Sequence, residues 1–438
     1  MTLATPITVI RGRFLDIQKT VSQAAEIADQ VRYLEDGVLI TEQGKIRWFG
    51  TWNDAQDHLP ANVDIQHYPE QLIIPGMIDT HIHFPQTEMV GAYGEQLLSW
   101  LNTYTFPTEI QFKDKAYASE IAKFFVNELL KNGTTTALVF CTVHPESVDA
   151  LFEAAEQHQM RLIAGKVMMD RHAPEALCDS ADSSYDDSKA LIEKWHGQGR
   201  ALYAITPRFA PTSTPEQLER AGQLKAEYPD VYVHTHLSEN KDEIAWVKDL
   251  FPAQKGYLDV YHHYGLTGQR SVFAHCVHLE DAEWQCMHET DSAIAFCPTS
   301  NLFLGSGLFP LNKTWQQQVK VGLGTDVGAG TSFSLLQTVN EAYKVQQLQG
   351  DKLSAYESLY HATLGGAKAL DLDDKLGNFN VGKEADFVVL NLKPTALQQL
   401  RQSRSKSLED SLFALFTMGD DRNVEATYIY GQKAYSQN

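Results

Sequence analysis

Long hydrophobic runs are absent from this 438-residue sequence, and cysteine is scarce. No apolar run reaches the roughly 18 residues of a membrane-spanning helix, and the N-terminal residues lack the apolar stretch of a signal peptide. The five cysteines are scattered without a Cys-x-x-Cys pair, which argues against a disulfide framework and against a structural zinc ribbon. We therefore predict a cytoplasmic protein that does not bind membranes.

Basic residues are also few. The 36 Lys and Arg residues are outnumbered by 56 Asp and Glu residues, which gives a formal charge of −20. Nucleic-acid binding requires clustered basic side chains that neutralise phosphates, so this balance disfavours nucleic acid as a partner. The sequence also has no phosphate-binding glycine loop, no Gly-x-Ser-x-Gly elbow and no His-Glu-x-x-His motif. A small molecule is the expected ligand.

What the sequence does have is a regular succession of short apolar runs, separated by segments long enough for a helix. The runs are 72–83, 134–140, 161–169, 201–209, 231–236, 271–276, 292–298 and 320–326. Intervening segments such as 117–132 carry apolar residues at three- and four-residue spacing, which is typical of amphipathic helices. Eight alternations in about 260 residues predict an α/β fold, a (β/α)8 TIM barrel. A doubly wound open sheet is the alternative.

The two ends of the chain have a different residue pattern. Residues 7–17, 37–50, 385–392 and 425–435 are rich in β-branched and aromatic residues and are interrupted by polar turn residues. We predict that residues 1–70 and 371–438 form a small discontinuous β-sandwich domain, and that residues 71–370 form the barrel.

Four of the predicted barrel strands end in side chains that can bind metals. Their sequences are DTHIH (79–83), HTHLSE (234–239), AHC (274–276) and GTD (324–326). The C-terminal ends of barrel strands surround one mouth, so these side chains should meet in space. Histidine nitrogens and a carboxylate suit Zn²⁺, and Fe²⁺ by the same logic. The sequence therefore predicts a metal site.

The spacing leaves one choice within this set open. Residues i and i+2 of a strand point to the same face, so His81 and His83 can converge on one ion. His234 and His236 have the same spacing, and periodicity does not say which of them is a ligand. Asp79 lies two residues before His81 and is expected to be a hydrogen-bonded residue inside the barrel.

These motifs resemble a known family. PGMIDTHIH (75–83), the later strand-end histidines, GTD (324–326) and the stretch 377–386 resemble the metal-dependent amidohydrolase superfamily over essentially the whole chain. Within it, HFPQTE (83–88), PRFAPT (207–212), HTHLSEN (234–240) and CPTSNLFLGSG (297–307) are similar to the guanine deaminases.

The resemblance implies a reaction and a set of site residues. The reaction is the zinc-dependent hydrolytic deamination of guanine to xanthine and ammonia in purine catabolism or salvage, with one Zn²⁺ per subunit of a homodimer. The implied zinc ligands are His81, His83, His236 and Asp326, with His275 beside the metal. The implied substrate-binding residues are His83, Phe84, Pro85, Gln86, Arg208, Phe209, His236, Leu237, Ser238, Glu239 and Asp326.

The chemistry of these side chains agrees with that reaction. Metal-activated water would attack C2 of guanine, with Asp326 accepting its proton, Glu239 shuttling protons to the ring and His275 polarising the reacting centre. On the purine edge, Arg208 can donate to O6 and N7, and Gln86 offers one donor and one acceptor. Phe209 can stack on the ring.

Two other functions fit parts of the pattern. The chain could be another deaminase or chlorohydrolase of the superfamily that acts on cytosine, s-triazines or related heterocycles. Binuclear members often carry a carboxylated lysine, for which Lys166 is the obvious candidate. A non-enzymatic scaffold is disfavoured, because such a protein has no use for Glu239 beside intact metal ligands.

Overall fold

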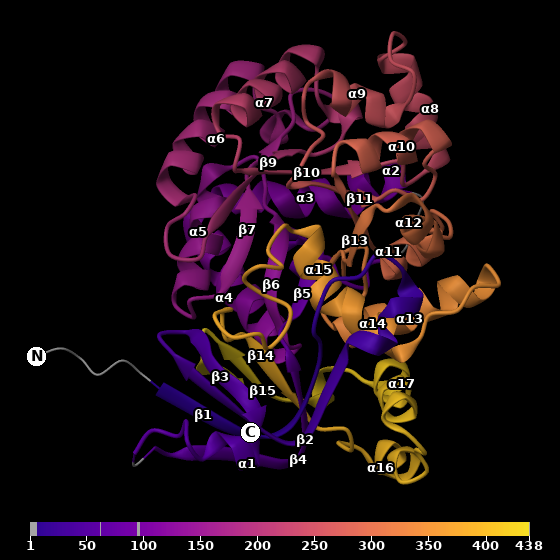
Figure 1. Cartoon of the computed structure of the whole chain (residues 1–438). Helices are drawn as coiled ribbons and strands as arrows, with labels where there is room; N and C mark the ends of the chain where they lie inside the picture. The colour runs from indigo at the N-terminus through magenta and orange to yellow at the C-terminus, as the bar shows by residue number, and fades with distance from the viewer. Residues whose placement is uncertain (1–6, 62, 94–96, 438) are drawn as a thin grey trace, which may run out of the picture.

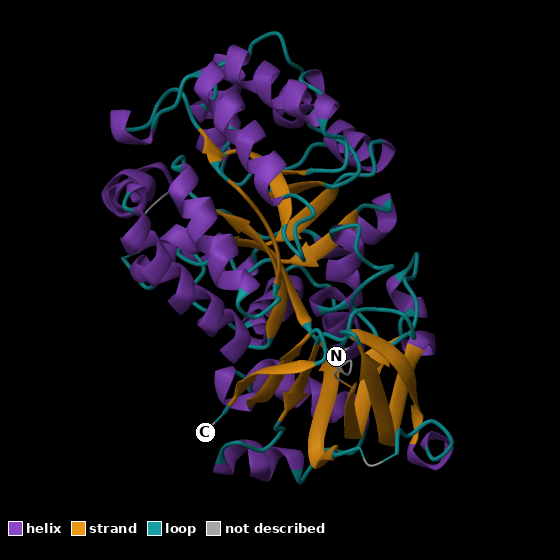
Figure 2. Ribbon diagram, turned by 90° about the vertical axis from the view of Figure 1, so that its left-hand side faces the viewer, coloured by secondary structure: helices purple, strands orange, loops and turns teal. Residues whose placement is uncertain are grey.

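The computed structural model describes residues 7–61, 63–93 and 97–437. A barrel of parallel strands wrapped by helices lies above a sheet built from both ends of the chain (Figures 1 and 2). None of the helices among the described residues is long and apolar enough to cross a membrane.

The predicted (β/α)8 barrel is confirmed, and the open sheet is not formed. Its strands, in spatial order, are β5 (Met77–His83), β6 (Thr134–Phe140), β7 (Arg161–Gly165), β9 (Leu202–Pro207), β10 (Tyr232–Leu237), β11 (Ser271–His275), β12 (Ala293–Phe296) and β13 (Lys320–Leu323). The two-residue strand β8 (Val167–Met168) pairs with β9. A hydrogen bond from Thr80 Oγ1 to Leu323 O, 3.0 Å long, links the last strand to the first.

Helices surround the barrel and cover its strands. The longer ones are α4 (Lys115–Lys131), α5 (Pro145–Glu156), α6 (Ala181–Trp195), α7 (Pro215–Glu227), α8 (Lys241–Leu250), α9 (Tyr257–His263), α10 (Asp281–Glu289), α12 (Leu311–Gln317), α13 (Leu335–Leu348) and α14 (Ala355–Ala362). Shorter helical turns are α2 (Leu97–Trp100), α3 (Phe106–Glu109), α11 (Pro298–Phe303) and α15 (Leu364–Ala369). In α4, Asp114 caps the first turn by accepting from the backbone of Ala116 and Tyr117.

The chain passes from the terminal sheet into the barrel at Gly76. The predicted run 72–83 is divided there, because β4 (Ile65–Pro75) belongs to the terminal sheet and β5 to the barrel. A Cβ on Gly76 would lie 2.0 Å from Thr135 Oγ1, so only glycine allows this close approach. The hydrophobic run is continuous because both of its halves are buried strands.

The terminal segments form a β domain, as predicted. Its strands are β1 (Ile7–Ile17), β2 (Val31–Glu42), β3 (Lys45–Thr51), β4, β14 (Phe387–Leu390), β15 (Val424–Ile429) and β16 (Gln432–Ser436). They lie in one sheet of order β16-β15-β14-β4-β1-β2-β3 rather than in two separate sheets. The sheet curls, because backbone bonds join Ile46 to Lys383 and Gly44 to Ala385, just before β14. Helices α1 (Trp52–Ala55), α16 (Ala396–Gln402) and α17 (Leu408–Met418) accompany it.

A buried network of charges joins the sheet to the lower end of the barrel. Arg161, the first residue of β7, and Arg200, just before β9, both bind Glu384. Arg200 also binds Asp386 through both Nη atoms. The domain bounds at residues 70 and 371 stay a prediction, but these contacts show that the two bodies share a common interface.

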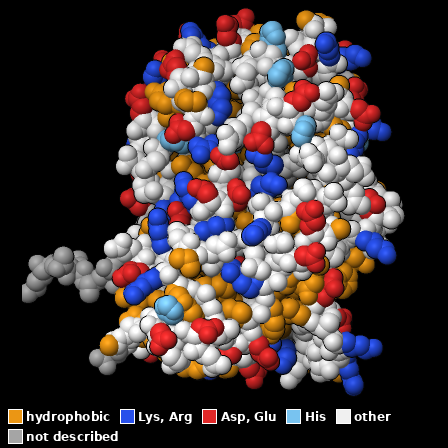
Figure 3. All heavy atoms as spheres, viewed as in Figure 1, with side chains coloured by type: hydrophobic (Ala, Val, Ile, Leu, Met, Phe, Trp, Pro, Cys, Tyr) orange, Lys and Arg blue, Asp and Glu red, His pale blue; other side chains and the backbone are white. Residues whose placement is uncertain are grey.

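On the face shown in Figure 3, acidic and basic side chains are intermingled, and hydrophobic side chains gather at the lower right near α17. A continuous basic surface of the kind that binds nucleic acid is not seen on this face.

Candidate functional site

The strand ends named in the sequence analysis meet at the upper mouth of the barrel. His81 and His83 end β5, His236 lies on β10, His275 ends β11, and Asp326 follows β13. The backbone bends sharply here, with positive φ angles of 71° at His275 and 51° at Asp326. These bends turn the side chains of His275 and Asp326 toward a common centre.

The potential ligand atoms converge closely. His81 Nε2 and His83 Nε2 lie 3.2 and 3.3 Å from Asp326 Oδ1, and His236 Nε2 lies 3.2 Å from His83 Nε2. Among the described residues, two groups could hold a metal ion: His81, His83 and His236, and His81, His275 and Asp326. The fold thus brings together all four residues that the resemblance implies as zinc ligands.

Protonation and hydrogen bonding fit a cation at this centre. Burial lowers the pKa of His81 to about 4, and burial likewise lowers the pKa of His83 and His236, so these imidazoles are neutral. His236 Nδ1–H donates to Arg208 O at 2.7 Å, which leaves the Nε2 lone pair facing the centre. His81 Nε2 is buried without a hydrogen-bond partner, and a bound cation would satisfy it.

His234 and Asp79 have supporting positions. His234 Nε2 lies 2.8 Å from His81 Nδ1, so it can orient the ring of His81 from behind. Of the two histidines that the spacing could not separate, His236 is therefore the one at the cluster. Asp79 is fully buried and accepts hydrogen bonds from Thr325 Oγ1 and from the backbone of Thr325 and His81. This agrees with the prediction that Asp79 is a satisfied polar residue.

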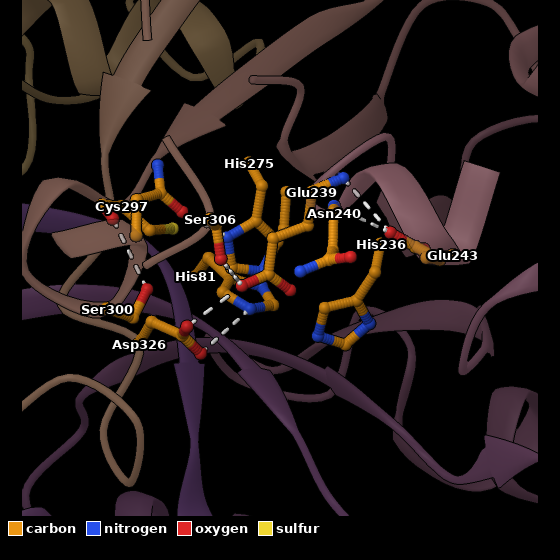
Figure 4. A network of polar contacts seen from close by, with 12 residues as sticks. His81, His236, Glu239, Asn240, Glu243, His275, Cys297, Ser300, Ser306 and Asp326 are labelled. Carbon is orange, nitrogen blue, oxygen red and sulfur yellow. Dashed lines mark hydrogen bonds and ion pairs between the residues drawn. The ribbon is translucent and has the colours of Figure 1, made fainter. Parts of the chain in front are cut away.

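Glu239 and His275 form a second cluster beside the ligand set (Figure 4). His275 Nε2 lies 3.5 Å from Glu239 Oε2 and 3.8 Å from Asp326 Oδ2, while Ser306 Oγ donates to Glu239 Oε1 at 2.8 Å. Burial raises the pKa of Glu239. Burial also opposes protonation of His275, but the carboxylates of Glu239 and Asp326 outweigh it and raise its pKa. The two side chains are therefore close enough to exchange a proton.

A cavity opens onto the cluster. It is lined by His83, Gln86, Trp100, Leu101, Arg208, Phe209, His236, Glu239, Glu243, His275, Leu304, Asp326 and Ala329. The site residues expected to face a substrate are mostly here. Its lining combines apolar side chains with a few polar and charged groups, as small-molecule sites do.

Four residues implied as substrate contacts lie elsewhere. Phe84 packs edge-on against Phe112 and Phe125 in the hydrophobic core, and Leu237 is also a core residue. Pro85 and Ser238 are buried but do not line the cavity. Side chains alternate along a strand end, so a contiguous motif cannot point every residue into the same space.

Two acidic residues at the site were missed by sequence reasoning. Glu243 accepts from the backbone N–H of Glu239 and Asn240, both at 3.1 Å, and so holds the turn that carries Glu239. Glu109, from the distant helix α3, binds Arg208. The three-residue spacing of Asn240 and Glu243 is that of a capping box, and it predicts that Glu243 accepts from the Asn240 N–H. No local pattern predicts the contact between Glu109 and Arg208.

Lys166 does not reach the ligand cluster. Its ammonium group is buried against Asp179, and it also donates to Val167 O at 3.3 Å. The structure therefore gives no support to a bridging lysine.

Comparisons with known proteins agree with this geometry. Residues 72–434 match the model of the amidohydrolase family. The chain belongs to the amidohydrolase family. It is 62% identical over 432 residues to the guanine deaminase of Escherichia coli (strain K12), covering 99% of this chain and 98% of the relative.

Solved structures of the same amidohydrolase family extend the match to three dimensions. The structure of E. coli guanine deaminase superimposes with a TM-score of 0.96 at 60% identity, covering 99% of this chain and all of that one. The guanine deaminase of C. acetobutylicum, solved with guanine in its active site, gives a TM-score of 0.88 at 31% identity and covers 98% of this chain and all of that one.

Proposed function

We propose that this amidohydrolase is a guanine deaminase, which hydrolyses guanine to xanthine and ammonia. The observation that carries the proposal is the convergence of His81, His83, His236 and Asp326 beside Glu239 and a cavity that Arg208 and Gln86 also line. The high identity to guanine deaminases over the whole chain supports the same substrate. Its place is then in purine catabolism or salvage.

The metal we propose is zinc, one ion per subunit, held by His81, His83, His236 and Asp326. Three imidazole nitrogens and one carboxylate suit zinc, although iron accepts the same ligands. When bound, the metal activates the attacking water by lowering its pKa toward neutrality. Metal analysis of purified protein distinguishes the two ions.

The protein's own residues then handle the protons. The water oxygen bonds to C2 of guanine, and the bond from C2 to the exocyclic nitrogen breaks. Asp326 is placed to accept one proton from water, and Glu239 to deliver one to N3. Glu239 then takes the proton of the new C2 hydroxyl and delivers it to the departing ammonia, and the proton on Asp326 restores Glu239. His275, held by Asn301 Oδ1 at 2.9 Å, faces both carboxylates and can stabilise the charge that develops.

Other side chains would hold the purine. Arg208 and Gln86 line one side of the cavity, where they can bind the polar edge of the base, and Phe209 offers a ring face. We expect the subunits to pair as homodimers in the cytoplasm. Sedimentation velocity measures the assembly state directly.

One assay tests the function. Zinc-loaded protein is incubated separately with guanine, adenine, cytosine and ammeline, and ammonia release is measured, with xanthine identified by chromatography. We expect ammonia from guanine in stoichiometric amounts with xanthine. Release from cytosine or ammeline, with none from guanine, would assign the chain to another substrate class of the superfamily.

A further inference from the structure

Glu109 is a buried carboxylate next to the proposed purine site, and the proposed chemistry gives it no role. It lies on α3, and none of its surface is exposed. It accepts hydrogen bonds from Arg208 Nη1 at 2.7 Å and from Arg208 Nη2 at 3.1 Å. A third bond comes from Gln86 Nε2 at 3.1 Å. A buried charge in such a position is costly unless all of these partners are present.

The Glu109 carboxylate fixes the orientation of the Arg208 guanidinium. A bidentate bond holds the guanidinium in one plane, and the ring of Phe106, also on α3, lies 5.5 Å from its central carbon. Glu109 engages one N–H of each Nη atom, so three of the five donors of Arg208 remain. Arg208 lines the cavity, and because a guanidinium has no acceptor it offers only hydrogen-bond donors to a ligand.

Glu109 also fixes the orientation of Gln86. A carboxylate accepts hydrogen bonds but cannot donate them, so the amide nitrogen of Gln86 faces Glu109 and its carbonyl Oε1 faces away. The same nitrogen lies 3.1 Å from His83 Nδ1, but this contact does not set its orientation, because a His83 that binds the metal through Nε2 carries its ring proton on Nδ1. The expectation of one donor and one acceptor from Gln86 therefore changes, since its nitrogen is turned toward protein atoms. What Gln86 offers the cavity is an acceptor.

We propose that Glu109 is a positioning residue that determines specificity for the lactam edge of guanine. The inference rests on the proposed function. Guanine presents an acceptor at O6 and a donor at N1–H, side by side, and these match a donor from Arg208 and an acceptor from Gln86. Through one carboxylate, Glu109 fixes the plane of the Arg208 donors and makes Gln86 an acceptor toward the base.

The purine that tests this pairing is 2,6-diaminopurine. It carries the same amino group at C2, so the same bond can be hydrolysed. At C6 and N1, however, it presents a donor and an acceptor, the reverse of guanine. Each of its groups would face a like group of Arg208 or Gln86, and unpaired buried polar groups carry a large cost.

The experiment measures kcat/KM for guanine and for 2,6-diaminopurine with the zinc-loaded protein and its Glu109→Gln variant. The unmodified protein should prefer guanine by at least about a hundredfold. In Glu109→Gln the neutral amide no longer dictates the orientation of Gln86, so the preference should fall about tenfold or more while KM for guanine rises. Glu109→Asp keeps the charge and should retain most of the preference.

Glu384→Gln is the matched control, because Glu384 is also a buried glutamate bound by arginines, but at the opposite end of the barrel. It should leave the preference unchanged. An unchanged preference in metal-replete Glu109→Gln would overturn the proposal. If that variant does not fold, comparable turnover of both purines by the unmodified protein would overturn it equally. Absence of xanthine from guanine would instead reject the proposed function itself.

Discussion

Individual residues at the barrel mouth differ in their chemical state because their immediate neighbours differ. Burial keeps His81, His83 and His236 neutral, as metal ligands must be. His275 has the same ring and the same burial, yet its pKa is raised by Glu239 and Asp326. One residue type therefore supplies both the proposed ligands and a partner for proton transfer.

The proposed proton shuttle is tested by Glu239→Gln. The amide can still accept from Ser306 Oγ, but it cannot carry a proton to the ring or to ammonia. We expect ammonia release to fall by about 10²-fold to 10⁴-fold, while the zinc content stays at the level of the unmodified protein. Glu283→Gln is the control, because Glu283 is a largely buried glutamate in the capping box of α10 and should leave turnover nearly intact. A near-normal rate in Glu239→Gln would show that another group moves the proton.

The sequence could predict those site residues that local patterns carry. Alternation along strands pairs His81 with His83, and barrel topology brings Asp326 to them across most of the chain. It could not predict Glu109, because this residue reaches Arg208 from a short helix between β5 and α4 whose path no periodicity describes. The choice of His236 over His234 also needed the three-dimensional position of both rings.

At the scale of elements, the apolar runs predicted the barrel strands to within a few residues. The predicted run 134–140 is β6 itself, and 271–276 exceeds β11 by one residue. The exception is the run 72–83, where strands of two different sheets follow each other through Gly76 and no polar residue marks the change. Hydrophobic patterning reports burial, and it does not report which sheet buries the strand.

The start of α8 should make stability depend on pH. Burial and the nearby Glu239 raise the pKa of Glu243 to about 7, from an ordinary value of 4.5. The folded protein therefore binds this proton more tightly than the unfolded chain. The stability that it contributes is complete below pH 4.5 and is lost as the pH rises to about 7.

Glu243→Gln removes this titration and keeps a capping box, since glutamine serves at that position. Relative to the unmodified protein, the variant should gain up to about 3 kcal/mol in unfolding free energy between pH 4.5 and pH 8. Urea unfolding at several pH values measures the difference. Glu216→Gln, an exposed glutamate in the first turn of α7, should leave the pH dependence unchanged. A pH-independent difference for Glu243→Gln would mean that the carboxylate is already ionised below pH 4.5.

For the molecule as a whole, the proposed metal links strands that are far apart in sequence. Ligands from β5, β10 and the end of β13 span the barrel, so an ion bound only by the folded state stabilises all of it. Removal of zinc with a chelator should abolish ammonia release and lower the melting temperature, and added zinc should restore both. At free zinc about 100 times its dissociation constant, the stabilisation is about 2.7 kcal/mol. Unaltered melting after verified metal removal would contradict this linkage.

The charge network between barrel and sheet makes the two bodies depend on each other. In Arg200→Ala, Asp386 loses both of its bonds to arginine, and Glu384 keeps only Arg161. Removing one partner of a buried pair leaves uncompensated charge and costs about 3–5 kcal/mol, whereas exposed pairs contribute less than about 1 kcal/mol. Arg220→Ala, which breaks an exposed pair with Asp182, is the control and should barely change the unfolding free energy.

Guanidinium unfolding, followed separately by far-UV circular dichroism and tryptophan fluorescence, measures both variants. We expect Arg200→Ala to shift both transitions together, because the network lies between the bodies and its loss weakens each of them. Activity per folded molecule should persist at low temperature, since Arg200 lies at the end of the barrel opposite the metal cluster. A loss below 1 kcal/mol, or a transition confined to one probe, would mean that the sheet and the barrel fold independently and that other contacts hold the catalytic mouth in shape.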